Sequence, residues 1–246
     1  MTSPEPALAA ADEPASTHAH RSTRIVLVRH AVTPETGSKL SGRAPGIDLS
    51  EVGRGQAEQA GARLAVVPVA AVYASPIERT TQTAELIAKH HGLAVQPLPG
   101  VIEADYGEWT GEKLVDLVKL DLWKTVQAAP SRVRFPDGEA MVAMQARMVE
   151  AIEALAVDHP GETIVVVSHA DPIKAAVAHF TGLPLDLFQR IAVSPASVTV
   201  LELGQFGATL VKSNDTGSMD DLVPKQSTPE AASEAAPAPG SEAEHD

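Results

Sequence analysis

The sequence predicts an α/β fold, a three-layer α/β/α sandwich around a mostly parallel central sheet. Two observations support this prediction. Strand-like apolar runs alternate with helical patterns along the chain, and the two strongest runs, residues 24–28 (RIVLV) and 163–168 (TIVVVS), are almost continuously apolar. Such β-branched runs are typical of strands covered on both faces, as in a parallel sheet between two layers of helices.

The first half of the chain alternates strand, helix, strand and helix. After the strand at 24–28, Ser50 is suited to cap a helix, because its hydroxyl can accept a hydrogen bond from the first turn. Residues 70–75 (AAVYAS) predict the second strand. Pro76 fits the first turn of the helix that follows, and Gly92 is a suitable C-terminal stop for it.

The second half continues the alternation. Residues 93–98 predict a weak strand, which Pro97 places at a sheet edge because proline has no N–H for the ladder. The remaining predicted elements are helices over 110–127 and 138–157, the strand at 163–168, a helix ending near Gly182, and a terminal hairpin of residues 198–203 and 208–212. The apolar stripe on the helix at 138–157 is interpreted as core; it contains Met141, Met144, Met148, Ile152 and Leu155.

Composition places one domain between two tails. Residues 1–23 and 214–246 are rich in Ala, Pro, Ser, Thr and Glu and lack periodicity. Such segments bury too little apolar surface to offset their ordering entropy, so both are predicted to be disordered. The domain is predicted over residues 24–213, a length sufficient for a substantial core.

Charge and cysteine content exclude several classes of function. Of the net charge of −13, the first tail carries −2 and the residues after Asn214 carry −7, which leaves −4 on the domain. A domain without a basic face is not expected to bind nucleic acid. Because the sequence shows no secretory signal and no apolar run of membrane-spanning length, a cytoplasmic protein without a membrane partner is expected. The absence of cysteine excludes disulfide and thiolate chemistry.

Two histidines follow the two strongest strands. His30 comes after the strand at 24–28, and His169 after the strand at 163–168. Because the carboxyl ends of parallel strands share one edge of the sheet, ligands bind there, and an imidazole in that place can attack phosphorus to form a phosphohistidine. Transfer of a phosphoryl group also needs fixed cations, which Arg29 and Arg79 can supply as guanidinium forks.

Two alternatives compete with this interpretation. The histidines could be ordinary polar residues at strand ends, but two of them at equivalent ends beside an arginine favour function. A zinc site is the weaker alternative, because no second His or Cys stands at ligand spacing from either, and the pair His18 and His20 falls in the first tail. No metal and no cofactor are therefore predicted.

Five segments of the sequence resemble the blocks of one known family. They are VRHAVT (28–33), GIDLSEVGRGQA (46–57), YASPIERTTQTA (73–84), IEADYGEWTG (102–111) and VVVSHADPIKA (165–175). In order and spacing they are similar to the histidine phosphatase superfamily, also called phosphoglycerate mutase-like, over about residues 24–213. The stretch 182–203 further resembles an actinobacterial branch of proteins described as probable phosphomutases.

The resemblance implies a role for each matching residue. His30 would be the nucleophile that becomes phosphorylated, and Arg29 and Arg79 would clamp the phosphoryl oxygens. His169 would stabilise their charge from the opposite side, and Glu103 would be the general acid. The positions implied to line the phosphate pocket are Thr33, Thr36, Ser41, Gly42 and Ala170.

The sequence departs from the family pattern at a few positions. Ala31 and Ala170 stand where the family usually has glycine, and Thr36 stands where many members have asparagine, which leaves the chemistry intact but puts substrate contacts in doubt. Asp105 is the rival general acid, ranked second because its spacing to the following glycine does not fit the pattern.

Three functions are compatible with these residues. The first is a phosphomonoester hydrolase acting on a small phosphorylated metabolite, the second is a phosphomutase of the phosphoglycerate mutase type, and the third is a non-catalytic module that binds phosphate or a phosphoprotein. The resemblance favours the hydrolase, because the segment between Glu103 and His169 is short and lacks the lid of the mutases. The oligomeric state is left open, with a dimer among the alternatives.

Overall fold

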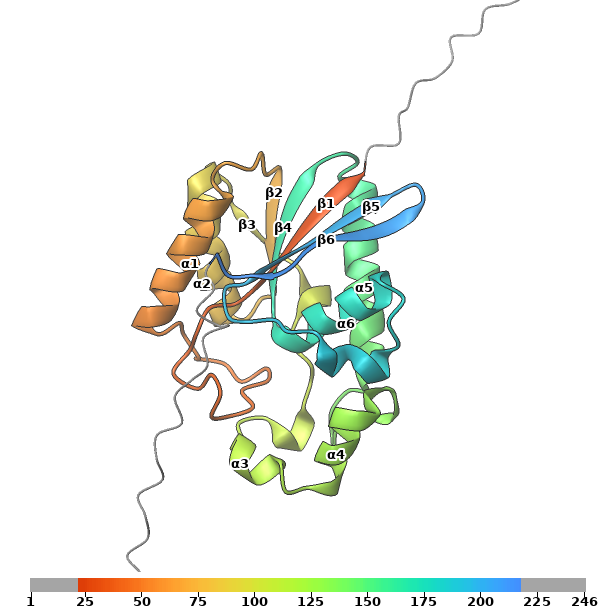
Figure 1. Cartoon of the computed structure of the whole chain (residues 1–246). Helices are drawn as coiled ribbons and strands as arrows, with labels where there is room; N and C mark the ends of the chain where they lie inside the picture. The colour runs from red at the N-terminus through yellow and green to blue at the C-terminus, as the bar shows by residue number, and fades with distance from the viewer. Residues whose placement is uncertain (1–21, 218–246) are drawn as a thin grey trace, which may run out of the picture. The chain divides into compact units, whose positions relative to one another are not determined.

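The computed structural model describes residues 22–217 and has a six-stranded sheet at its centre (Figure 1). The strands lie in the order β3-β2-β4-β1-β5-β6. Their bounds are Thr23–Arg29 for β1, Ala71–Ala74 for β2, Val95–Pro97 for β3, Thr163–Ser168 for β4, Val198–Gly204 for β5 and Gly207–Asp215 for β6. The four strands from β3 to β1 are parallel, whereas β5 and β6 form an antiparallel hairpin, so the predicted mostly parallel sheet is confirmed.

Two pairs of helices cover the sheet (Figure 1). Helices α1 (Glu51–Leu64) and α2 (Glu78–Ala88) lie on one face, and α5 (Met141–Asp158) and α6 (Ala170–Phe180) lie on the other. Two short helices, α3 (Leu114–Leu117) and α4 (Asp121–Ala128), lie beyond the carboxyl ends of the parallel strands. The 3₁₀ turns are η1 (Lys89–His91), η2 (Pro99–Val101), η3 (Gly107–Trp109), η4 (Pro130–Arg132) and η5 (Leu185–Arg190).

Strand β1 shows why these strands are apolar on both faces. Ile25 and Leu27 pack with α5 and α6, whereas Val26 and Val28 pack with α1 and α2. Alternate side chains of a strand point to opposite faces, so a strand between two helical layers must be apolar throughout. The apolar stripe predicted on α5 is confirmed as core, with Met141, Met144, Met148, Ile152 and Leu155 all buried.

Local capping signals in the sequence are confirmed in part. The Ser50 hydroxyl accepts the Gly53 N–H at 3.0 Å and caps α1. Gly92 ends η1 in the left-handed conformation (φ 65°), which glycine adopts without steric cost. The prediction for Pro76 is wrong, because Ile77 is the N-cap of α2 and Pro76 lies in the loop before it.

The predicted helix over 110–127 is also wrong, since the chain forms α3 and α4 instead. The physical reason lies in the side chains that face the interior. Leu114 and Trp123 line the same cavity, yet nine positions along one α-helix are about two and a half turns, which would place them on opposite sides. The break between the two helices turns Trp123 back toward the cavity.

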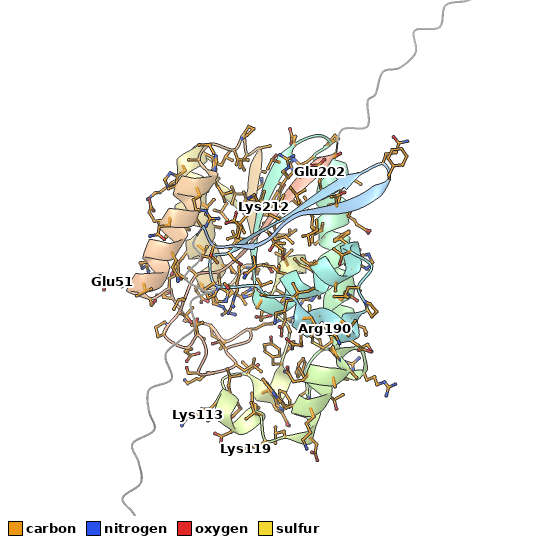
Figure 2. The ribbon with its side chains drawn as sticks, in the orientation of Figure 1. Glu51, Lys113, Lys119, Arg190, Glu202 and Lys212 are labelled. Atoms are coloured by element: carbon orange, nitrogen blue, oxygen red, sulfur yellow. The ribbon has the colours of Figure 1, made fainter. Side chains whose placement is uncertain are left out.

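The sheet begins and ends slightly outside the predicted domain bounds of 24–213. Strand β1 begins at Thr23 and β6 ends at Asp215, whereas the predicted tails at 1–23 and 214–246 lie almost entirely outside the described residues. Exposed charged side chains such as Lys113 and Lys119 lie at the periphery (Figure 2). Within residues 22–217, no helix combines the length and the apolar character that crossing a bilayer requires.

Candidate active site

Strand pairing brings the two predicted histidines together. In the parallel pair β1 and β4, Arg29 lies opposite Ser168, and the N–H of His30 donates to the carbonyl of Ser168 at 2.9 Å. His30 and His169 come directly after Arg29 and Ser168, and their ring centroids lie 5.3 Å apart. The shared edge predicted from the two strands is thus where the candidate site forms.

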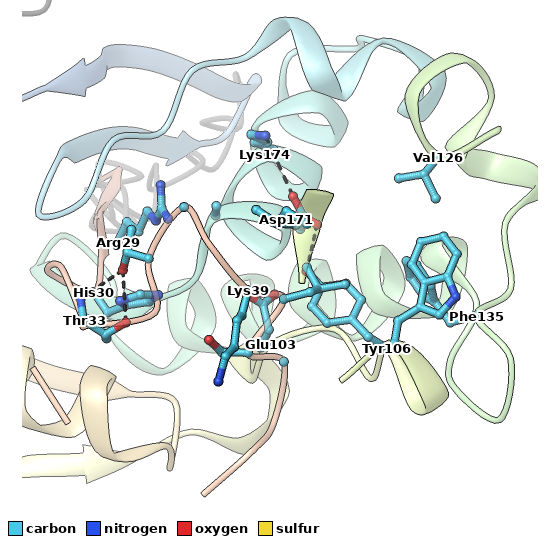
Figure 3. A pocket seen from close by; sticks show the side chains of 18 of the residues that line it. Arg29, His30, Thr33, Lys39, Glu103, Tyr106, Val126, Phe135, Asp171 and Lys174 are labelled. Atoms are coloured by element: carbon cyan, nitrogen blue, oxygen red, sulfur yellow. Dashed lines mark hydrogen bonds and ion pairs between the residues drawn. The ribbon is translucent and has the colours of Figure 1, made fainter. Parts of the chain in front are cut away.

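A cavity of about 350 Å³ opens at this edge (Figure 3). The predicted site residues in its lining are Arg29, His30, Thr33, Thr36, Ser41, Gly42, Arg79, Glu103 and Ala170. His169 is fully buried and lies behind this lining. The structure therefore gathers all ten predicted site residues around one cavity, nine of them on its wall.

His30 is arranged as a nucleophile. Its Nδ1 lies 2.8 Å from the carbonyl oxygen of Ala31, which can only accept, so Nδ1 carries the hydrogen and Nε2 keeps its lone pair. Burial, followed by the charges of Arg79 and Arg29, lowers the pKa of His30 to about 3. The imidazole is therefore unprotonated at neutral pH and able to attack an electrophile.

Two guanidinium groups, that of the buried Arg79 and that of the partly buried Arg29, face the same cavity. Arg79 donates from Nη2 to the carbonyl of Gly42 at 2.6 Å, and Arg29 donates from Nη1 to the carbonyl of Val193 at 2.8 Å. Nη1 of Arg79 and Nε of Arg29 are buried without a partner among the described residues. Burial lowers the pKa of both groups, yet arginine keeps its charge, so these donors are suited to an anion with several oxygens.

His169 contacts Arg79 rather than the cavity. Arg79 Nη2 donates to Nδ1 of His169 at 3.2 Å, and Nε2 of His169 then donates to the hydroxyl of Ser75 at 2.9 Å. Burial, followed by the charge of Arg79, holds the pKa of His169 well below its usual range. Both ring nitrogens of His169 are therefore engaged in hydrogen bonds, and the residue orients Arg79. The charge stabilisation expected from His169 would act through the Arg79 guanidinium.

Glu103 is a carboxyl group held in a buried place. Its Oε1 accepts the N–H of Ala104 at 2.9 Å, and its Oε2 lies 3.8 Å from Nδ1 of His169. Burial, followed by the nearby charge of Asp171, raises the pKa of Glu103 to about 7. The carboxyl group can therefore hold a proton close to neutral pH, as a general acid must.

Asp105, the second candidate for the general acid, has different surroundings from Glu103. Its side chain is 43% exposed and lies 3.6 Å from Nη1 of Arg43. It also accepts the N–H of Gly107 at 3.1 Å, and it is not part of the cavity wall. The geometry favours Glu103 over Asp105.

The raised pKa of Glu103 predicts a cost in stability. Between its ordinary value of 4.5 and about 7, the unfolded chain releases the proton that the folded chain keeps, so folding stability falls as pH rises through this window. Above it the cost is about 3 kcal/mol. We expect Glu103→Gln to match the wild type near pH 4 and to exceed its free energy of unfolding by about that amount near pH 8.5, measured by urea denaturation. A difference independent of pH would contradict the prediction.

The loop after His30 shapes the end of the cavity at which His30 and the two arginines lie, called the phosphate end below. The N–H of Thr33 donates to Oγ1 of Thr36 at 2.9 Å, and Ser41 donates to Glu35 at 2.9 Å. Gly42 has φ 52°, and an added Cβ would lie 3.0 Å from Tyr106, so glycine is required there. Hydrogen bonds within the loop therefore hold its side chains in place at this end of the cavity.

The alanines in place of the family's glycines fit their positions. Neither Ala31 nor Ala170 has a positive φ, so a methyl group adds no backbone strain. The N–H of Ala31 already donates to Oγ1 of Thr83 at 3.2 Å and is not free for a phosphoryl oxygen. Ala170 begins α6 and lines the cavity, so the start of that helix remains open to an anion.

Several residues that line the cavity were not predicted from the sequence. Tyr106 donates to Asp171 at 2.9 Å, and Lys174 lies 3.8 Å from the same carboxylate (Figure 3). Asp171 and Lys174 lie on the same side of α6, so helical spacing from Ala170 could have found them. Trp109 and Trp123 stack with ring centroids 6.2 Å apart and also line the cavity, so both are part of its outer wall.

Two exposed arginines near the start of α5, Arg132 and Arg134, do not line the cavity. His18 and His20 lie outside the described residues. Within residues 22–217, no group of three His, Cys, Asp or Glu side chains is placed to hold a metal ion.

Comparison with known proteins shows which family this chain belongs to. Phosphoserine phosphatase 1 of Hydrogenobacter thermophilus is 31% identical over 199 residues, covering 78% of this chain and 92% of that protein. The probable phosphoglycerate mutase GpmB of Erwinia tasmaniensis is 30% identical, covering 72% and 83%. The solved structure of YhfR from Bacillus stearothermophilus is 27% identical with a TM-score of 0.74, covering 78% and 97%. Since the family model for the histidine phosphatase superfamily (branch 1) also matches residues 25–216, the chain that builds this histidine and arginine site is a member of that enzyme family.

Proposed function

We propose that this enzyme is a metal-independent phosphomonoester hydrolase that acts on a small phosphorylated metabolite through a phosphohistidine at His30. The observation that carries the proposal is the neutral His30, with Nε2 unengaged, in a cavity shared with unpaired donors of Arg29 and Arg79. These two cations supply the charge that a phosphoryl group needs as it moves.

The proposed reaction has two steps. Nε2 of His30 attacks phosphorus, the bond from phosphorus to the leaving oxygen breaks, and that oxygen takes the proton of Glu103. In the second step the Glu103 carboxylate accepts a proton from water, and the water oxygen attacks phosphorus and releases His30. Inorganic phosphate and the alcohol are the products, and Glu103 regains its proton. Arg29 and Arg79 hold the phosphoryl oxygens in both steps, with His169 orienting Arg79.

A mutase is the second candidate. A relative 30% identical to this chain is named a probable phosphoglycerate mutase, so phosphoryl return to a second hydroxyl is a specific alternative. The hydrolase is favoured because the segment that extends over the cavity away from His30 contains only the short helices α3 and α4. A phosphohistidine under so short a cover is accessible to water.

One experiment separates the two candidates. The purified enzyme, with EDTA present, is expected to release inorganic phosphate from p-nitrophenyl phosphate. On a panel containing O-phosphoserine and 3-phosphoglycerate, the compounds that the relatives' names suggest, turnover is expected to appear as phosphate release. Isomerisation of 3-phosphoglycerate without phosphate release would make the enzyme a mutase. Binding of phosphorylated compounds without turnover of any would make it a binding module.

A further inference from the structure

We propose that Arg43, Glu139 and Arg147, none of which lines the cavity, form a clamp that positions Glu103 for proton transfer. The inference rests on the proposed function and names the residues that fix its general acid. The two arginines meet at the backbone carbonyl of Glu103, and the Glu139 carboxylate joins them.

Two arginines hold the peptide of Glu103 itself. Nε of Arg43 donates to the carbonyl oxygen of Glu103 at 2.8 Å, and Nη2 of Arg147 donates to the same oxygen at 3.0 Å. Nη1 of Arg147 also donates to the carbonyls of Gly100, at 2.9 Å, and Ile102, at 2.7 Å. One guanidinium group therefore fixes three carbonyls of the segment that leads into the acid.

Glu139 joins the two arginines. Its Oε1 accepts from Nη2 of Arg147 at 2.7 Å and from Nη2 of Arg43 at 3.1 Å, and its Oε2 accepts from Nε of Arg147 at 3.2 Å. Oε1 also accepts the N–H of Asp105 at 2.9 Å. The Glu139 side chain is 17% exposed, and a partly buried, bidentate pairing of this kind has a defined geometry.

The segment that carries Glu103 has no regular backbone ladder of its own to fix the Glu103 peptide. Residues 102–106 belong to no helix or strand and run between η2 and η3. Regular hydrogen-bond ladders hold His30, Arg79 and His169 at the ends of β1, α2 and β4, whereas the clamp provides this support for Glu103. Because the carbonyl and the carboxyl belong to one residue, rotation of the peptide would displace the acid from the leaving oxygen.

The clamp also relates the acid to the phosphate end of the site. Arg43 directly follows Gly42, whose carbonyl accepts from Arg79 at 2.6 Å. One short stretch of chain therefore contacts both the phosphoryl cation and the peptide of the acid. A displacement of about 1 Å between reacting groups can lower a rate by about 100-fold, so this connection is expected to matter for catalysis.

The test compares two substrates that differ in one nitro group. Nitrophenolate is a stable anion that leaves without a proton, whereas phenolate leaves more readily when an acid protonates it. We expect Glu139→Gln and Arg147→Lys to lower kcat/KM for phenyl phosphate by about 10- to 100-fold and to change it for p-nitrophenyl phosphate by less than about threefold. Equal losses on both substrates, or no loss on either, would overturn the proposal.

Matched variants separate the clamp from general damage. The Arg63 side chain is 33% exposed, as is that of Arg43, and it pairs with Asp215 at 3.0 Å, so Arg63→Lys is the control for Arg43→Lys. Arg63→Lys is expected to leave both substrates unchanged, and a loss confined to phenyl phosphate in that variant would count against the clamp. If Glu139→Gln fails to fold, Arg43→Lys takes its place in the test. A loss confined to phenyl phosphate in Arg43→Lys then supports the clamp, and equal losses or no loss overturn it.

The same substrate pair distinguishes failure of the clamp from failure of the proposed function. Glu103→Gln removes the acid and must itself show the selective loss on phenyl phosphate. If Glu103→Gln shows no selectivity, the assignment of the acid is wrong and the clamp falls with it. If Glu103→Gln is selective but the clamp variants are not, only the clamp is overturned.

Discussion

His30→Ala is expected to lower kcat for p-nitrophenyl phosphate by at least about 10⁴-fold, because it removes the atom that accepts the phosphoryl group. The arginines would still bind phosphate, so KM is expected to change much less than kcat. The variant should keep its fold, since the side chain loses one hydrogen bond, from Nδ1 of His30 to Ala31, and one ring contact, with His169.

The measurement combines turnover with labelling. Wild-type enzyme mixed with a phosphate-labelled substrate and denatured rapidly in alkali is expected to carry label on one histidine, and His30→Ala is expected to carry none. His179→Ala is the control, because His179 is exposed at the end of α6. Retained hydrolysis in His30→Ala, or label on the protein without His30, would contradict the phosphohistidine mechanism.

The sheet explains how much of the site could be predicted. Apolar runs at 24–28 and 163–168 predicted buried parallel strands, and the histidines after them were expected at one edge. Direct pairing of β1 with β4 could not be predicted from periodicity, because these strands are far apart in sequence and β2 and β3 intervene. That pairing is what sets the rings of His30 and His169 5.3 Å apart.

Residues that act through tertiary contacts were the ones missed. Arg147 lies on α5, an arginine on a helix is usually solvated, and only the folded chain brings this one to the carbonyl of Glu103. The outer wall of the cavity was missed for a related reason. Trp123 reaches it only because the chain breaks between α3 and α4, and local helical spacing favoured one continuous helix.

His169 illustrates the limit of transferring roles by resemblance. The motif placed it in the site, and the structure agrees on its location next to His30. Its orientation depends on Ser75, which follows β2 and accepts from Nε2 of His169. That bond turns Nδ1 toward Arg79, so the side chain supports a cation that faces the cavity, an arrangement that no single sequence block contains.

Glu103→Gln is expected to lower kcat/KM for phenyl phosphate by about 10²- to 10⁴-fold, because glutamine has no proton to give to the leaving oxygen. The pH dependence of kcat/KM tests whether Glu103 is the general acid. With the pKa of Glu103 raised to about 7, the active protonated form predominates below that pH, and kcat/KM falls about tenfold per pH unit above it. The variant is expected to lack this alkaline decline.

The ratio of variant to wild-type rates removes the substrate's own ionisation from the comparison. On the acid side, the pKa of His30 is lowered to about 3, so the nucleophile stays unprotonated well below neutral pH and contributes no decline there. Asp105→Asn is the matched control, since Asp105 is a half-exposed carboxylate two residues away and paired with Arg43. An alkaline decline that survives in Glu103→Gln but disappears in Asp105→Asn would transfer the role of general acid to Asp105. Persistence of the decline in both variants would place the titrating group elsewhere in the site.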